Sequence, residues 1–353
     1  MQSTSISRRR FLGTAAAGAL ATGALPNVIT SAKAQGKNEL VFVGFGGNYQ
    51  DGQTKALFEP FEKETGIKVI QTTGVDLAKL RAQIQSKNIE WDLISIPDRL
   101  RYTAVKDDLL TRLNYSVINA KDVMPQLVTD YAVGCVTIAM LLTYSTKAYP
   151  AGKAPQSWPD FWDAKKFPGP RGYYNAPTYS LEFALIADGV PKDKLYPLDV
   201  PRALKSLDRI KPDVKVWWSQ FPQPGVLLKS GEITATPWTR SISFVLEGEP
   251  MGISYEGAAL TYEAWVVPKG APHADNAMKF INFALQPKPQ AELTKYIAFG
   301  PTNGKAMPLV DPKLRPLLPS HPDNIKKGFL LSGDWWGPNL DKVNEQWNEW
   351  RLK

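Results

Sequence analysis

Hydrophobic and polar positions follow two alternating periodicities in the first third of the chain. Short apolar runs typical of buried strands occur at residues 39–44, 67–70 and 91–96. Between them, residues 54–63 and 77–84 carry apolar side chains at the spacing of one helix face. Strands that alternate with helices of about 10–15 residues indicate a parallel sheet. This part of the sequence therefore predicts an α/β lobe.

A long apolar run of β type at residues 133–144 exceeds what one lobe needs and can cross between two lobes. The further elements predicted are helices at residues 181–188, 203–210, 223–229, 274–285 and 340–352, and strands at residues 233–236 and 262–268. The chain has 353 residues, and domains commonly hold about 100–200. We therefore expect two lobes.

The N-terminus has the pattern of an export signal. Arg8, Arg9 and Arg10 precede a weakly apolar run at residues 13–25, and Ala-Lys-Ala follows at residues 32–34. A charged start, a short apolar run and a cleavage site of small residues predict a signal peptide at residues 1–34. The twin arginine predicts the Tat route and a periplasmic protein. A membrane anchor is the alternative, but the run is shorter than the ~20 residues needed to span a bilayer.

Composition excludes several function classes. The net charge is +8, and half of it lies in the first 34 residues, which contain no acid. The basic excess therefore does not indicate a nucleic-acid surface. The single cysteine, Cys135, excludes a disulfide framework, and its apolar neighbours predict an inert thiol in a buried strand. Two histidines argue against a zinc site or a Ser-His-Asp triad. We expect no catalytic residue, metal or cofactor.

Two glycine motifs near the start lack a residue that their usual chemistry requires. Gly44-Phe45-Gly46-Gly47 resembles a dinucleotide loop, but Tyr49 occupies the third glycine position. The segment 47–54 has the Walker A spacing, but Gln53 replaces the lysine that contacts phosphate. What remains is a glycine turn before a helix, whose N–H groups could hold an anionic ligand end.

Four segments in order, residues 58–69, 91–93, 267–272 and 277–285, resemble the extracellular solute-binding proteins of ABC importers. The resemblance is to the spermidine/putrescine-binding group, which has the type II periplasmic-binding fold, and it covers nearly the whole mature chain. It implies a receptor rather than an enzyme, with a small-molecule solute and a membrane permease as partners. It also implies capture by lobe closure, and we expect a monomer.

The resemblance implies a two-lobed α/β fold, in which each lobe is a mixed sheet flanked by helices and hinge strands lie between. On this fold residues 35–142 form the first part of lobe I and residues 143–263 form lobe II. Residues 264–353 return to lobe I and supply the C-terminal helices. The hinge is expected near residues 142–144 and 264–266.

Ligands of open α/β sheets bind beyond the carboxyl ends of strands, so loops at strand ends supply the candidates. The predicted ligand-binding residues are Asn48, Tyr49, Asp98, Arg99, Asn175, Tyr179, Trp238, Arg240, Tyr262, Glu263, Phe299 and Trp336. In the family, aromatic residues at such positions stack on amines by cation–π contact. Trp238 and Tyr262 fall at strand ends beside polar residues and are the main aromatic candidates.

The charged candidates indicate the kind of solute. By the resemblance, Glu263 stands where the family has an acid that faces a terminal amine, but the second acidic pair falls at Ala176 and Tyr179. Glu182, one helical turn later, either substitutes or is solvated. One acid near Arg99 and Arg240 favours a monoamine or an ω-amino acid over spermidine, because arginine suits a carboxylate.

Three alternatives stay open at this stage. Tyr173-Tyr174 raises a ferric-iron receptor of the same fold, since related iron binders use tyrosine ligands. An organophosphonate receptor would use the arginines. An exported hydrolase would need a nucleophile–base pair or a metal cluster, and the two histidines, His273 and His321, stand in loop-like or Pro-rich settings.

Overall fold

A computed structural model of the chain describes residues 38–353. The signal peptide and the twin-arginine motif predicted at residues 1–34 lie outside this range, so both stay predictions. Within the described range, no helix is both long enough and apolar enough to cross a membrane.

The first part of the fold is a parallel βαβ arrangement, as the sequence pattern predicts. Its elements are β1 (Glu39–Gly44), α1 (Gly47–Gln53), α2 (Glu59–Thr65), β2 (Lys68–Thr73), α3 (Leu77–Gln85) and β3 (Leu93–Pro97). Strand β1 pairs in parallel with both β2 and β3. Gly66, with φ of 71°, ends α2 in the left-handed conformation that glycine adopts without strain.

The helix predicted at residues 54–63 begins earlier than expected. It starts at Gly47, and the five residues Thr54–Phe58 form a wider, π-type turn between α1 and α2. Gly46, with φ of 74°, allows the sharp turn from strand to helix. Asn48 and Tyr49 therefore lie on a helix and not in a glycine loop. Strand β3 begins two residues later than predicted, so Trp91 precedes it.

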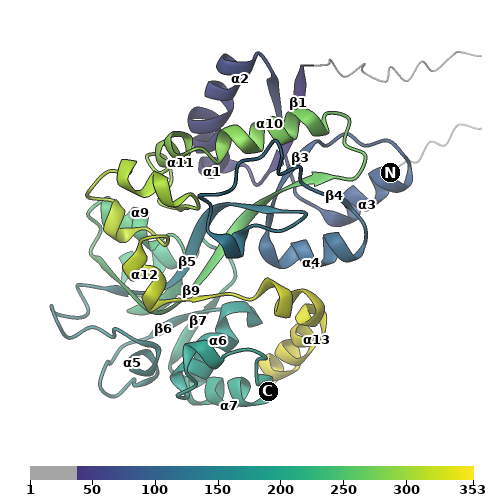
Figure 1. Ribbon diagram of the computed structural model, residues 1–353. Helices are drawn as coiled ribbons and strands as arrows, with labels where there is room; N and C mark the ends of the chain where they lie inside the picture. The colour runs from purple at the N-terminus through teal and green to yellow at the C-terminus, as the bar shows by residue number, and fades with distance from the viewer. Residues whose placement is uncertain (1–37) are drawn as a thin grey trace, which may run out of the picture. The chain divides into compact units, whose positions relative to one another are not determined.

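Two long antiparallel strands, β5 (Val133–Ser145) and β9 (Met251–Pro268), join the two halves of the fold. Among the described residues the strands form one mixed sheet with the order β2-β1-β3-β9-β5-β8-β6-β7. The other members are β4 (Leu110–Thr111), β6 (Arg171–Tyr174), β7 (Val214–Trp218), β8 (Ala235–Trp238), β10 (Gly300–Pro301) and β11 (Phe329–Leu330). The predicted α/β class is confirmed (Figure 1).

Helices cover this sheet. They are α4 (Asp98–Lys106), α5 (Trp158–Trp162), α6 (Pro177–Ala187), α7 (Val200–Ile210), α8 (Gln223–Ser230), α9 (Ser241–Leu246), α10 (Ala274–Ala284), α11 (Pro287–Leu293), α12 (Pro322–Lys327) and α13 (Gly333–Leu352). Polar side chains fix several starts. Asp76, Asp199 and Ser332 accept hydrogen bonds from the first-turn N–H groups of α3, α7 and α13, as N-cap residues do.

Two large apolar cores define the two lobes. The core of lobe I joins buried residues from segment 40–136 to those from segment 262–293. The core of lobe II joins residues from segment 140–259 to the tryptophans of α13. The crossover strands β5 and β9 contribute to both cores.

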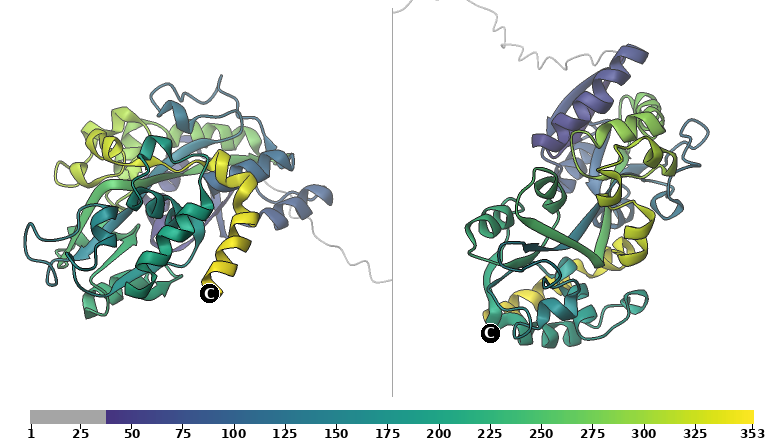
Figure 2. Two further views of the ribbon diagram at one scale, coloured as in Figure 1. Left: turned by 90° about the horizontal axis from the view of Figure 1, so that it is seen from below. Right: turned by 90° about the vertical axis from the view of Figure 1, so that its left-hand side faces the viewer.

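The C-terminal helix α13 contacts both lobes, whereas the prediction places residues 264–353 with lobe I. Trp336, Trp347 and Trp350 of α13 are buried in the core of lobe II, where the Trp350 ring lies 5.7 Å from the ring of Trp217. The helix lies beside α7 in the views of Figures 1 and 2. The reason is the aromatic stripe along α13, which α6 and α7 cover.

Candidate functional site

Strand β9 places Tyr262 and Glu263 beside the start of α4. Glu263 pairs in register with Pro97, the residue that directly precedes α4. The hydroxyl of Tyr262 donates to Asp98 Oδ1 at 2.5 Å, and Arg101 Nε donates to the same oxygen at 2.7 Å. Asp98 is only 5% exposed. Its carboxylate is therefore held by protein donors and fixes the start of α4 against β9.

Glu263 carries a carboxyl oxygen with nothing to bind. Its Oε2 is shielded from solvent and has no hydrogen-bond partner among residues 38–353. Burial raises the pKa of Glu263 to about 7, the charge of Arg99 opposes that rise, and Asp98 adds to it. A buried carboxylate without a partner costs free energy. The position therefore suits a cation that arrives with the solute.

Arg99 is the complementary unpaired charge. Its side chain is partly buried, and it forms no hydrogen bond or ion pair within the described part of the chain. Its charge nevertheless acts on Glu263 and on Tyr174 and Tyr179 of lobe II, since it opposes the rise in the pKa of all three groups. A guanidinium without a partner can bind a carboxylate through two parallel hydrogen bonds.

Tyr179 lies at a kink in the backbone near the start of α6. Its φ of 72° is left-handed, and Thr178 before it is extended. Such a conformation costs a non-glycine residue about 1–3 kcal/mol, so the surrounding contacts hold the ring in place. The ring lies 6.2 Å from that of Tyr174, which in turn lies 4.7 Å from that of Trp218. Burial raises the pKa of Tyr179 to about 12, so its hydroxyl stays protonated at neutral pH.

On the side of lobe I, Tyr49 is a further aromatic residue near Glu263. Its ring packs edge-on against Phe299 at 5.3 Å, and its hydroxyl lies 3.7 Å from Cys135 Sγ. The thiol of Cys135 donates to the backbone oxygen of Glu263 at 3.2 Å. Burial raises the pKa of Cys135 to about 12, so the predicted buried thiol in a strand is confirmed. Tyr49 and Cys135 thus support β9 behind the Glu263 carboxyl.

Sequence reasoning missed Ser95. It is fully buried in β3, and its hydroxyl lowers the pKa of both Tyr49 and Cys135, so it lies beside these two groups. The signal was present, since a serine interrupts an otherwise apolar strand between Ile94 and Ile96.

Two of the aromatic residues predicted to bind the ligand, Trp238 and Trp336, lie in the core of lobe II. Trp238 is 0% exposed, its indole N–H donates to the oxygen of Phe221 at 2.6 Å, and its ring packs on Phe244. Trp336 is also 0% exposed and donates to Glu182 Oε1 at 2.6 Å. The strand end that suggested an open position for Trp238 pairs with β5 inside the sheet, which encloses the indole.

Three polar candidates show no interaction with Glu263 among the described residues. Asn48 is exposed on α1, and Arg240 is exposed at the start of α9. Asn175 Oδ1 accepts a hydrogen bond from Arg351 Nε of α13 at 3.1 Å. The structure therefore brings together Tyr49, Asp98, Arg99, Tyr179, Tyr262, Glu263 and Phe299, and leaves Asn48, Asn175, Trp238, Arg240 and Trp336 outside this group.

Glu182 is fully buried, which excludes a solvated position. Its Oε1 accepts from Trp336 Nε1 and from the Tyr196 hydroxyl at 2.8 Å, whereas its Oε2 has no partner in the described residues. Burial raises the pKa of Glu182 to about 7, and the two hydrogen bonds oppose that rise. It follows Tyr179 by three residues on α6, and whether it takes the place of a second acid stays a prediction.

The tyrosine pair considered for iron does not converge. Tyr173 is fully buried and its hydroxyl donates to the oxygen of Ser180, whereas Tyr174 faces Tyr179 and Trp218. Neighbouring residues of a strand point to opposite faces, so the two hydroxyls cannot ligate one ion. Across residues 38–353 no group of three His, Cys, Asp or Glu is placed to hold a metal.

Two surface hollows lie away from this site. One, of about 380 Å³, is lined by residues 115–121 and Val128, and the other, of about 460 Å³, lies between α7 and α13. Neither contains a predicted binding residue. The charges of Glu263 and Arg99, and not these hollows, therefore define the candidate site.

The fold and the site define a two-lobed binding protein, and comparison with known proteins identifies its family. Residues 56–319 match the family model described as bacterial extracellular solute-binding protein. A gamma-aminobutyric acid-binding protein of Pseudomonas aeruginosa is 31% identical over 92% of this chain and 93% of its own length. A spermidine/putrescine-binding periplasmic protein of Escherichia coli is 25% identical over 90% of this chain and 91% of its own length.

Solved structures of binding proteins have the same fold as this chain. The binding protein AgtB of Agrobacterium tumefaciens, solved in complex with agropinic acid, is 42% identical. It superposes with a TM-score of 0.74 over 89% of this chain and 99% of its own. The chain thus belongs to the bacterial extracellular solute-binding family. The predicted family and two-lobed fold, and with them a solute-binding function, are confirmed, and the iron, phosphonate and hydrolase alternatives are not favoured.

Proposed function

We propose that this protein captures a small solute with an ammonium group at one end and a carboxylate at the other, as in an ω-amino acid such as 4-aminobutyrate. The observation that carries the proposal is the presence of two unpaired opposite charges at one site. Glu263 Oε2 lacks a partner in the described chain, and the guanidinium of Arg99 forms no hydrogen bond or ion pair there. The solute's ammonium would bind Glu263 and its carboxylate would bind Arg99.

The same charges disfavour a diamine. A second ammonium would lie beside the like charge of Arg99, and Tyr179 stands at one of the positions where the polyamine group has an acid. An ammonium buried without a partner costs several kcal/mol. Tyr174 and Tyr179 add faces that suit an ammonium or its methylenes by cation–π contact. These arguments favour an ω-amino acid over putrescine or spermidine.

A second candidate solute is an organic acid such as agropinic acid. It is favoured by the 42% identity to a protein bound to agropinic acid. In that case Arg99 would hold the acid, and Glu263, whose pKa is about 7, would donate a hydrogen bond from its protonated form.

The predicted signal peptide and the names of the relatives support a periplasmic receptor that delivers its solute to the permease of an ABC importer. Export by the Tat route and a monomeric state belong to this proposal. Lobe closure around the solute would be the capture step, because a ligand that contacts both lobes stabilises the closed form. No chemistry on the solute is needed, and the relatives are named for binding.

A thermal-shift panel tests the proposal on the chain from Gln35 onward, with 4-aminobutyrate, putrescine and agropinic acid as probes. A binder raises the melting temperature by mass action. We expect a rise with 4-aminobutyrate that is lost in Glu263→Gln and in Arg99→Gln. The matched controls are Glu256→Gln, an exposed acid on the same strand, and Arg240→Gln, an exposed arginine outside the site. A rise with putrescine alone would overturn the proposal, and a rise with agropinic acid alone would establish the second candidate.

A further inference from the structure

The first turn of α13 contacts both lobes at once. Gly333 lies against the carboxylate of Asp98, and Gly337, one turn later, lies against Tyr102 of α4. In both places a Cβ atom would overlap these neighbours. The two glycines therefore let α13 approach the helix of lobe I that begins beside the candidate site.

Arg101 ties this turn to the solute site. Its Nε donates to Asp98 Oδ1 and its second guanidinium nitrogen donates to Asp334 Oδ1, each at 2.7 Å. The same oxygen of Asp98 accepts from Tyr262, the neighbour of Glu263. A continuous set of hydrogen bonds thus runs from β9 through Asp98 and Arg101 to α13.

The opposite face of the same turn is bound to lobe II. Trp336 donates to Glu182 of α6, and the N–H of Ser332 donates to the hydroxyl of Tyr196 at 3.1 Å, which itself donates to Glu182. Glu182 follows Tyr179 by three residues on α6. The turn of α13 therefore lies between the residues that place Glu263 and those that place Tyr179.

We propose that Arg101, Asp334, Trp336 and Glu182 form an interlobe clasp through which α13 sets the spacing of the two halves of the solute site. The clasp holds lobe I and lobe II in the arrangement in which Arg99 acts on both Glu263 and Tyr179. It binds no solute itself, and Arg101 and Asp334 are positioning residues. Its effect on solute affinity rests on the function proposed above, whereas its effect on lobe spacing does not.

Asp334 gives a clean perturbation, because its side chain is 79% exposed and contributes little to the core. An ion pair with so exposed a partner contributes little to stability, so we expect Asp334→Asn to fold. The matched control is Asp323→Asn. Asp323 is 69% exposed in the first turn of α12, and its nearby lysine, Lys326, is on the same helix and links no lobes.

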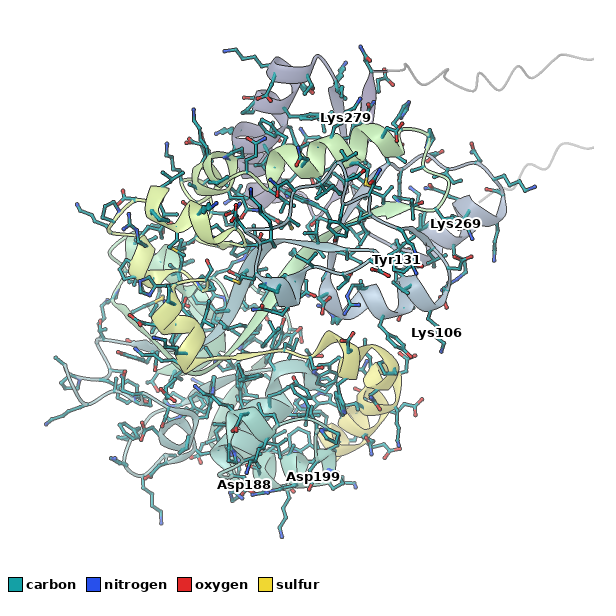
Figure 3. All side chains as sticks on the ribbon, in the orientation of Figure 1. Lys106, Tyr131, Asp188, Asp199, Lys269 and Lys279 are labelled. Atoms are coloured by element: carbon teal, nitrogen blue, oxygen red, sulfur yellow. The ribbon has the colours of Figure 1, made fainter. Side chains whose placement is uncertain are left out.

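The direct test measures the distance between lobes without solute. Spin labels are attached through Lys279→Cys on α10, whose side chain is seen in Figure 3, and Lys205→Cys on α7; both positions are exposed. The native Cys135 is buried and should not label. We expect Asp334→Asn to lengthen or broaden the distance distribution from double electron–electron resonance, and Asp323→Asn to leave it unchanged. An unchanged distribution in Asp334→Asn would overturn the clasp.

Affinity provides the second readout. We expect Asp334→Asn to weaken 4-aminobutyrate binding roughly three- to tenfold, with no further loss when the same change is made in an Arg101→Gln background. Equal losses in both backgrounds would mean that Asp334 does not act through Arg101. If the distances change as expected but no variant or parent binds 4-aminobutyrate, the clasp stands and the proposed solute fails.

Discussion

Replacing Glu263 by glutamine should weaken solute binding and stabilise the solute-free protein. The change removes the charge of a shielded carboxyl whose Oε2 has no partner among the described residues, and nearly preserves its shape. Losing a charge-assisted hydrogen bond and leaving the ammonium unpaired costs roughly 2–4 kcal/mol. At about 1.4 kcal/mol per tenfold, this is about a 30- to 1,000-fold rise in Kd.

The stability effect has the opposite sign. Burial raises the pKa of Glu263 to about 7 from 4.5, so the folded protein holds this proton more tightly than the unfolded chain. Stability is therefore lost as the pH rises from about 4.5 to 7, and the full penalty is present above 7. Glutamine carries no such penalty. At pH 8 the variant should be more stable by about 1–3 kcal/mol, and at pH 4 the difference should vanish.

Calorimetric titration at pH 7.5 and urea unfolding at pH 4 and pH 8 measure the two effects. Glu256→Gln is the control, because it removes an exposed acid from the same strand and should alter neither quantity. A residue with only a structural role would lose stability when replaced. Unchanged affinity together with lower stability at pH 8 would show that Glu263 has a structural role and does not bind the solute.

Solution pH, replacement of either arginine and replacement of the buried Trp238 should each affect binding or stability in a different way. Because binding an ammonium needs ionised Glu263, affinity for 4-aminobutyrate should fall about 100-fold between pH 8 and pH 5 by titration calorimetry; a flat profile would contradict the assignment. Arg99→Gln should weaken 4-aminobutyrate by roughly 1.5–3 kcal/mol, whereas Arg240→Gln should not; equal effects would remove Arg99 from the site. Trp238→Phe should lower the unfolding free energy by about 1–3 kcal/mol through loss of its bond to Phe221, with little change in Kd; a change confined to Kd would instead place the indole against the solute.

The sequence was most informative where periodicity is strong. The helix at residues 77–84 and the strand at residues 133–144 lie within one or two residues of α3 and β5, because apolar spacing reports directly on the face that a segment buries. The long strands that both lobes share were predicted from the length of one apolar run. The glycine turn was predicted to precede a helix, but not that the helix begins as early as Gly47, because residues 47–53 carry no apolar periodicity.

The site was only partly predictable, because side-chain direction depends on tertiary neighbours. Glu263 and Arg99 were found from strand-end positions, and the structure puts them within electrostatic reach of each other. Trp238 occupies a similar strand-end position but is enclosed by the sheet and by Phe244. The contact of α13 with lobe II depends on packing between segments more than 100 residues apart in sequence, which no local pattern reports.

In the proposed function, Glu263 and Arg99 together bind the two ends of one zwitterion. The most direct measurement compares 4-aminobutyrate with its two halves, butylamine and butyrate, by calorimetric titration of the protein from Gln35 onward. Each charged contact contributes roughly 1.5–3 kcal/mol, so we expect the zwitterion to bind at least about tenfold more tightly than either half. Equal affinity for butylamine and 4-aminobutyrate, or tighter binding of putrescine, would contradict the account.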